Sequence, residues 1–131
     1  LITRMKRMNV GFDLSTKLSH YLTRNINLMG KIKEKKELEP YIRGKIGGHG
    51  EYSLYSSIKY AKEGYDGIIH LLPLSCMPET TIEMLMSRVS SKYRIPIYRF
   101  PIDENRFEAG FETRINTFIS VLKRKKRCIS A

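Results

Sequence analysis

The run Ile-Ile-His-Leu-Leu at residues 68–72 constrains the fold more than any other feature of the sequence. Successive side chains of a strand point to opposite faces of a sheet, so this run would be apolar on both faces apart from His70. Strands of this kind lie in the middle of parallel sheets that helices cover on both sides. Asp66-Gly67 precedes the run and Pro73 ends it. The sequence therefore predicts a buried central strand.

Apolar residues at helical spacing precede and follow this strand. We expect helices at residues 14–29, 51–63, 78–89 and 105–122, and a second strand at residues 95–100, bracketed by Pro96 and Pro101. Gly30 would end the first helix, and Pro40 would limit helix formation in the charged residues 31–43. The alternation of helices and strands with short links predicts an α/β fold with parallel strands. A further strand near Val10 is left open.

The length of 131 residues suits one domain, which we assign to residues 1–122, with a basic tail at residues 123–131. Lysine and arginine total 24 against 13 acidic residues, a net charge of +11, and residues 123–127 are all basic. We interpret this charge as a source of solubility and a solvated tail. An alternative function is a polyanion- or nucleic-acid-binding module without metal. Nucleic acid is not the expected partner, because the aromatic and glycine-rich pattern of RNA-binding sheets is missing.

Composition also restricts the compartment. No apolar run approaches the roughly 18–20 residues of a membrane span. No apolar signal segment follows the N-terminal basic residues. With two cysteines, Cys76 and Cys128, the chain is not a disulfide-rich secreted scaffold. We expect a cytoplasmic protein without a membrane partner. Because the sequence begins with Leu1 rather than methionine, we also expect a piece of a longer protein.

Cys76 is the residue best placed for chemistry. It follows the predicted buried strand and precedes a helix that would begin near Pro78, while Pro73 stiffens the other side of the loop. Open α/β sheets bind ligands at the carboxyl ends of their strands. The N–H groups at a helix start favour a thiolate, which binds metal or acts as a nucleophile. Position alone leaves a buried structural cysteine equally open.

A glycine-rich loop at residues 44–50 is a second candidate region, because its backbone N–H groups can face an anion. The loop matches neither the P-loop nor the dinucleotide-binding pattern. The candidates for binding an anion or lining a cluster loop are Gly47, Gly48, His49, Gly50, Ser75 and Arg114.

The other titratable residues receive structural interpretations. Three acids precede the last helix, where acidic side chains ordinarily pair with the helix dipole, namely Asp103, Glu104 and Glu108. Arg114 is a candidate partner for one of them. We predict that His70 is a hydrogen-bonded core histidine and that His20 lies at the surface or its boundary.

Three motifs occur in order along the chain: residues 47–50 (Gly-Gly-His-Gly), 60–69 (Tyr-Ala-Lys-Glu-Gly-Tyr-Asp-Gly-Ile-Ile) and 73–79 (Pro-Leu-Ser-Cys-Met-Pro-Glu). Shorter matches follow at residues 95–96, 103–104, 108–110 and 113–119. In these motifs the chain resembles, over roughly residues 40–125, the C-terminal region of acyl-CoA dehydratase activase-related proteins. Those proteins are similar to 2-hydroxyacyl-CoA dehydratase subunits.

The resemblance implies a Rossmann-like open sheet with mainly parallel strands and helices on both faces. It also implies that a cysteine at a strand end ligates a 4Fe–4S iron–sulfur cluster, and Cys76 matches that cysteine. The implied activity is low-potential electron transfer, with an ATP-dependent activator as partner. The parent enzymes are dehydratases, which are lyases, or their activator system. We do not expect this chain to be catalytic alone.

The ligand count shapes this hypothesis. A cubane cluster normally takes three or four protein ligands, and only Cys76 matches the family pattern. Further cysteines would come from an N-terminal domain or a partner subunit, so a cluster in the isolated chain would be incomplete or absent. We expect Cys128 to be inert. A homodimer is left open, and thiol chemistry at Cys76 without metal is a third hypothesis.

Overall fold

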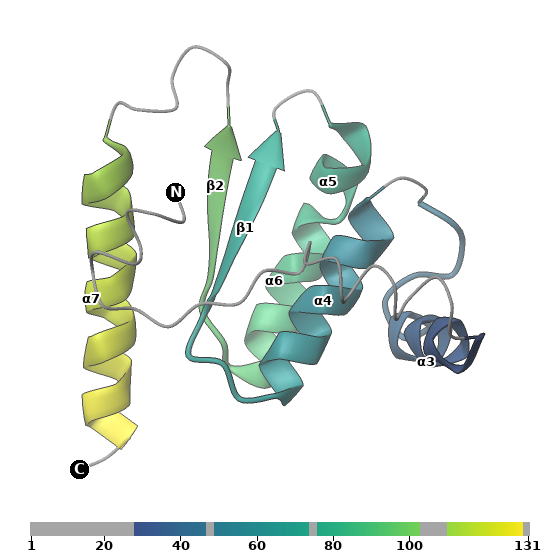
Figure 1. The fold of residues 1–131 in the computed structure, drawn as a ribbon, viewed down its shortest axis with the longest axis horizontal. Coiled ribbons are helices and arrows are strands. Elements are labelled where there is room, and N and C mark those ends of the chain that lie inside the picture. The colour runs from purple at the N-terminus through teal and green to yellow at the C-terminus, as the bar shows by residue number, and fades with distance from the viewer. Residues whose placement is uncertain (1–27, 47–48, 74–75, 103–109, 130–131) are drawn as a thin grey trace. The chain divides into compact units, whose positions relative to one another are not determined.

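The computed structural model describes residues 28–46, 49–73, 76–102 and 110–129 (Figure 1). Its elements are α3 (Leu28–Leu38), α4 (Gly50–Lys62), β1 (Ile68–Pro73), α5 (Met77–Thr81), α6 (Glu83–Tyr93), β2 (Ile97–Ile102) and α7 (Phe111–Ile129). The chain divides into two compact units, Leu1–Lys35 and Lys36–Ala131. The possible strand near Val10 and nearly all of the helix expected at residues 14–29 lie outside the described residues.

The first described helix, α3, corrects one prediction and confirms another. Gly30 lies inside α3, so it does not end a helix there. A glycine within a helix costs about 1 kcal/mol relative to alanine, which neighbouring helix-forming residues can offset. The helix ends at Leu38, two residues before Pro40, as the proline predicted. The backbone N–H groups of Tyr41 and Ile42 then donate to the Leu38 carbonyl.

The predicted α/β fold with parallel strands is confirmed in the described residues. β1 and β2 pair in parallel, from Ile68 opposite Ile97 to Pro73 opposite Ile102. β2 begins two residues later than predicted and includes Pro101, so Pro101 does not mark its end. A proline is tolerated near the end of a strand where its missing N–H removes no ladder hydrogen bond.

Helices lie on both faces of this sheet. On one face, Arg99 of β2 forms hydrogen bonds with Glu83 and Ser87 of α6. On the other face, Tyr98 and Phe100 of β2 contact aromatic rings of α7, at centroid distances of 5.4 Å and 5.0 Å. Figure 1 shows the same division, with α7 on one side of the strands and α4 and α6 on the other. This arrangement explains why β1 is largely apolar on both faces.

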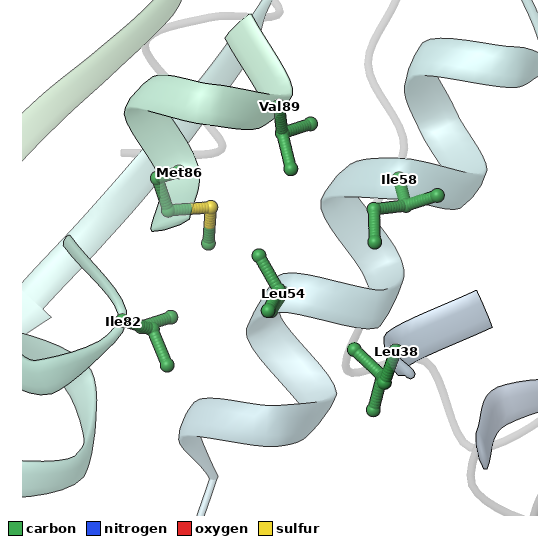
Figure 2. Packing of buried hydrophobic residues seen from close by; sticks show 6 residues of the cluster. All are labelled: Leu38, Leu54, Ile58, Ile82, Met86 and Val89. Atoms are coloured by element: carbon green, nitrogen blue, oxygen red, sulfur yellow. The ribbon is translucent and has the colours of Figure 1, made fainter. Parts of the chain in front are cut away.

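A hydrophobic core joins α4 and α6 (Figure 2). Its members are Leu38, Leu54, Ile58, Ile82, Met86 and Val89, none more than 7% exposed. The residues from α4 follow a spacing of four, which places them on one face of that helix. This core holds α4 and α6 together on one face of the sheet.

The helix expected over residues 78–89 is two helices. Ile82 lies between them, as the C-cap residue of α5 and the N-cap residue of α6. Its N–H donates to the Pro78 carbonyl at 3.3 Å. The apolar spacing of residues 82–89 predicted the buried face of α6 but not this break. The break leaves α5 with five residues.

The predicted apolar stripe of the last helix is confirmed for α7. Phe111, Ile115 and Phe118 are buried, and the basic residues 123–127 continue the helix. α7 also passes close to the start of β1, where a Cβ on Gly67 would lie 2.7 Å from Leu122 Cδ2. The predicted helix start at residues 105–108 lies outside the described residues. No described helix combines the length and the apolar character needed to cross a membrane.

Candidate functional site

Cys76 lies between the carboxyl end of β1 and the first turn of α5, as the sequence predicted. Its backbone is extended, with φ −94° and ψ 96°, and Pro78 occupies the first turn of the helix that follows. The Cys76 N–H donates to the Pro73 carbonyl at 3.0 Å, and its carbonyl accepts from the Thr80 N–H and hydroxyl, both at 3.1 Å. The backbone of Cys76 is therefore fixed on both sides.

The Cys76 side chain, unlike its backbone, is not held by a disulfide bond or a capping hydrogen bond in the described structure. It is a free, partly buried cysteine, and its side chain forms no capping hydrogen bond with α5. Cys76 is therefore not a fully buried residue, as many structural cysteines are. Cys128 is also free but exposed, on the last turn of α7. The two cysteines thus occupy contrasting environments.

The structure brings two of the sequence motifs together, because the start of α4 packs against α5. Gly50, the last glycine of the Gly-Gly-His-Gly motif, is buried. A Cβ at Gly50 would lie 2.6 Å from the Pro78 carbonyl oxygen and 3.0 Å from its carbon. Real side chains do not approach backbone so closely, so this contact requires glycine. Gly50 therefore contributes to close packing, whereas the sequence suggested an anion-binding role.

A chain of hydrogen-bonded polar side chains links α4, α5 and β1, with His70 and Glu79 buried and Ser53 half-buried. Ser53 Oγ donates to Glu79 Oε1 at 2.8 Å, and Glu79 Oε2 lies 2.7 Å from His70 Nε2. The His70 and Glu79 side chains are 6% and 7% exposed. An unpaired carboxylate or imidazole would cost several kcal/mol at such burial, so each group depends on the other. His70 is a core histidine, as predicted, and Glu79 is its partner.

The hydrogen bonds that join Ser53, Glu79 and His70 were not predicted from the sequence. A histidine inside a strand that is otherwise apolar requires a polar partner, and that requirement was the available signal. The nearest carboxylate after the strand is Glu79, three residues beyond Cys76. Ser53 is 26 residues from Glu79, and no local pattern connects them.

Two other predicted site residues, His49 and Arg114, are exposed in the described structure. His49 is the exposed N-cap residue of α4 and forms no side-chain capping bond. The Arg114 guanidinium lies over the Phe100 ring, 5.9 Å from its centroid, and Arg114 is exposed. The remaining candidates lie outside the described residues, namely Gly47, Gly48, Ser75, Asp103, Glu104 and Glu108.

The described residues contain no group of three or more His, Cys, Asp or Glu side chains able to hold a metal ion. A metal ion at Cys76 would therefore find one soft sulfur atom there rather than a full set of ligands. A cluster bound at Cys76 requires ligands from beyond this group of residues.

Two side chains outside the Ser53–Glu79–His70 chain have shifted pKa values, namely Lys62 and Tyr93. A hydrogen bond to the Glu37 carboxylate raises the pKa of the Lys62 ammonium. Burial raises the pKa of the Tyr93 hydroxyl. Lys92 lies over the rings of Tyr41 and Tyr93, 5.4 Å and 5.6 Å from their centroids.

Comparison with models of known protein families, with curated proteins and with solved structures finds no match to this chain. The resemblance in the sequence motifs is therefore tested by none of these comparisons and stays a prediction.

Proposed function

We propose that this chain is an α/β domain of an iron–sulfur protein related to 2-hydroxyacyl-CoA dehydratases and their activases. In this proposal Cys76 is one ligand of the cluster, which would supply low-potential electron transfer. Support comes from the Pro-Leu-Ser-Cys-Met-Pro-Glu motif and from the place of its cysteine in the fold.

One observation carries the proposal: the backbone of Cys76 is fixed while its thiol is free and only partly buried. The Pro73 carbonyl and Thr80 hold the backbone from both sides. The sulfur lies past the carboxyl end of a parallel strand, the edge at which open α/β sheets bind ligands. A metal ligand requires this combination, because fixed geometry lowers the entropic cost of binding.

The proposal assigns the remaining ligands to another domain or a partner subunit. It also assigns β1 and β2 to a larger, Rossmann-like sheet, since their parallel pairing with helices on both faces suits one. The expected partner is an ATP-dependent activator that delivers the electron.

Iron and sulfide analysis after anaerobic reconstitution tests the proposal. We would compare the full-length gene product with its Cys76→Ser and Cys128→Ser variants. Cys76→Ser should lower bound iron and sulfide per chain, and Cys128→Ser should leave both unchanged because Cys128 is exposed at the end of α7. Equal iron in Cys76→Ser and the parent would show that Cys76 is not a ligand.

A second measurement separates metal binding from thiol chemistry without metal. An alkylation pH profile of the metal-free 131-residue chain with Cys128→Ser reports the reactivity of Cys76 alone. A cysteine that acts as an activated nucleophile titrates below the usual value of about 8.5. A lowered midpoint together with no iron binding would favour the thiol hypothesis over the cluster.

A further inference from the structure

We propose that the hydrogen-bonded chain Ser53–Glu79–His70 is a positioning unit that sets the placement and accessibility of the Cys76 thiol. The inference deepens the proposed function and rests on it in taking Cys76 as the functional group. Its evidence is separate, because it comes from hydrogen bonds and burial rather than from the family resemblance.

α5 is so short that its position depends on neighbouring elements. A helix of five residues has little stability of its own, because helix formation is cooperative and its nucleus is costly. Contacts with neighbouring elements must therefore hold α5 in place. Three such contacts are visible: Gly50 against the Pro78 carbonyl, Ile82 in the core, and the carboxylate of Glu79.

The hydrogen bonds of Glu79 are directional, unlike the other contacts that hold α5. Ile82 and Gly50 supply non-directional packing, whereas Glu79 accepts hydrogen bonds from two different elements at 2.7 Å and 2.8 Å. Hydrogen bonds to an ionised carboxylate are about twice as strong as neutral ones and are directional. They fix the rotation of the first turn of α5, where Cys76 is the N-cap residue and Glu79 lies three residues later. Cys76 therefore moves if Glu79 moves.

The two ring nitrogens of His70 have different surroundings. Its Nε2 faces the Glu79 carboxylate, while its buried Nδ1 has no hydrogen-bond partner among the described residues. An ionised carboxylate only accepts hydrogen bonds, so the proposal places a proton on Nε2, and Glu79 is the polar partner that orients the ring among the described residues. This arrangement resembles the carboxylates that orient histidines behind metal sites.

Alkylation kinetics of Cys76 test the proposal. The experiment uses the metal-free full chain with Cys128→Ser, which leaves one thiol, and measures the rate with iodoacetamide under native conditions. Glu79→Ala should raise the rate by about tenfold, because the loosened segment opens more often. Glu79→Gln should give a smaller increase, since its amide oxygen can still accept from Ser53.

Two controls separate positioning from a general loss of stability. Glu83→Gln removes an exposed carboxylate of α6 that pairs with Arg99, and it should leave the rate unchanged. Val89→Ala weakens the core away from the Cys76 segment, and it should lower global stability without raising the alkylation rate. A folded Glu79→Ala chain that reacts at the parent rate would overturn the proposal, as would an equal acceleration in Val89→Ala.

A spectroscopic measurement covers the case in which Glu79→Ala does not fold. Nitrogen-15 NMR of the parent should show His70 protonated at Nε2, with the signal assigned by its loss in His70→Gln. Ser53→Ala should keep that protonation and raise the alkylation rate by about threefold, since one hydrogen bond is lost. A ring protonated only at Nδ1, or an unchanged rate in Ser53→Ala, would contradict the positioning unit. No iron enters these measurements, so a failure of the ligand proposal is recognised separately.

Discussion

The segment around Cys76 and the second half of α7 illustrate two ways in which one chain places polar groups. Around Cys76, the carboxylate and imidazole of Glu79 and His70 are buried and paired. In the second half of α7, Lys123, Arg124 and Arg127 are exposed. Residues 113–129 contain no acid, so these cations have no partner of opposite sign within that stretch of the helix.

The difference is one of energetic dependence. A buried charge requires its partner, because removing one member leaves the other without water or a counter-charge. An exposed cation near a helix C-terminus is solvated and gains a few tenths of a kcal/mol from the helix dipole. The Cys76 region should therefore be sensitive to single substitutions, whereas the end of α7 should tolerate them.

The largest effect is expected from Glu79→Ala. This substitution leaves the buried His70 and the half-buried Ser53 without their partner, so the free energy of unfolding should fall by about 3–5 kcal/mol. Urea denaturation measures the change. The matched control is Glu83→Ala, whose exposed pair with Arg99 is worth at most about 1 kcal/mol. Equal losses in the two variants would remove the distinction between the two regions.

Gly50→Ala should have the next largest effect. The added methyl would meet the Pro78 backbone at 2.6 Å, and overpacking of this kind costs about 1–3 kcal/mol. Gly44→Ala is the control, because no atom lies within 4 Å of its added methyl. Thermal unfolding should separate the two variants clearly. A Gly50→Ala chain as stable as Gly44→Ala would show that α4 and α5 do not pack as closely as described.

Small effects are expected in α7. Lys123→Ala, Arg124→Ala and Arg127→Ala should each change the free energy of unfolding by less than about 0.5 kcal/mol. Lys125→Ala should cost slightly more, because Lys125 donates to the carbonyl of Arg94 at the end of α6. Urea denaturation again provides the measurement. A loss above 1 kcal/mol at any of the first three positions would mean that this end of α7 is structurally engaged.

The same end of α7 tests the polyanion alternative. If residues 123–127 bind phosphates, the affinity for duplex DNA should fall with salt at a slope of about 0.9 per phosphate contact. Replacing Arg124 and Arg127 by alanine should lower the steepness of that slope by the amount expected for about two phosphate contacts. A salt titration by fluorescence anisotropy gives both values. No binding at low salt would exclude the alternative.

The same comparison shows how far the sequence predicts the structure. Periodic patterns predicted β1 and the apolar face of α7, because burial of a whole face leaves a repeating signal. The place of Cys76 between β1 and α5 was predicted because it follows from the order of these elements along the chain. The break at Ile82 was missed, since the helical spacing of residues 82–89 begins at the break and carries no sign of it.

The Ser53–Glu79–His70 chain was missed for a different reason. Each residue alone suits several environments, and only the fold brings α4, α5 and β1 together. The close packing of Gly50 was not foreseen, because a glycine needed for close packing and one needed for anion binding look alike in a sequence. Both depend on contacts between distant segments, which no local pattern encodes.

Cysteine footprinting tests the central claim most directly. The full-length gene product would be alkylated with and without prior anaerobic loading with iron and sulfide, and mass spectrometry would quantify both cysteines. We predict that loading protects Cys76 and leaves Cys128 reactive, because only the first is held at the carboxyl end of β1. Unchanged labelling of Cys76 in protein that has bound iron would contradict the account.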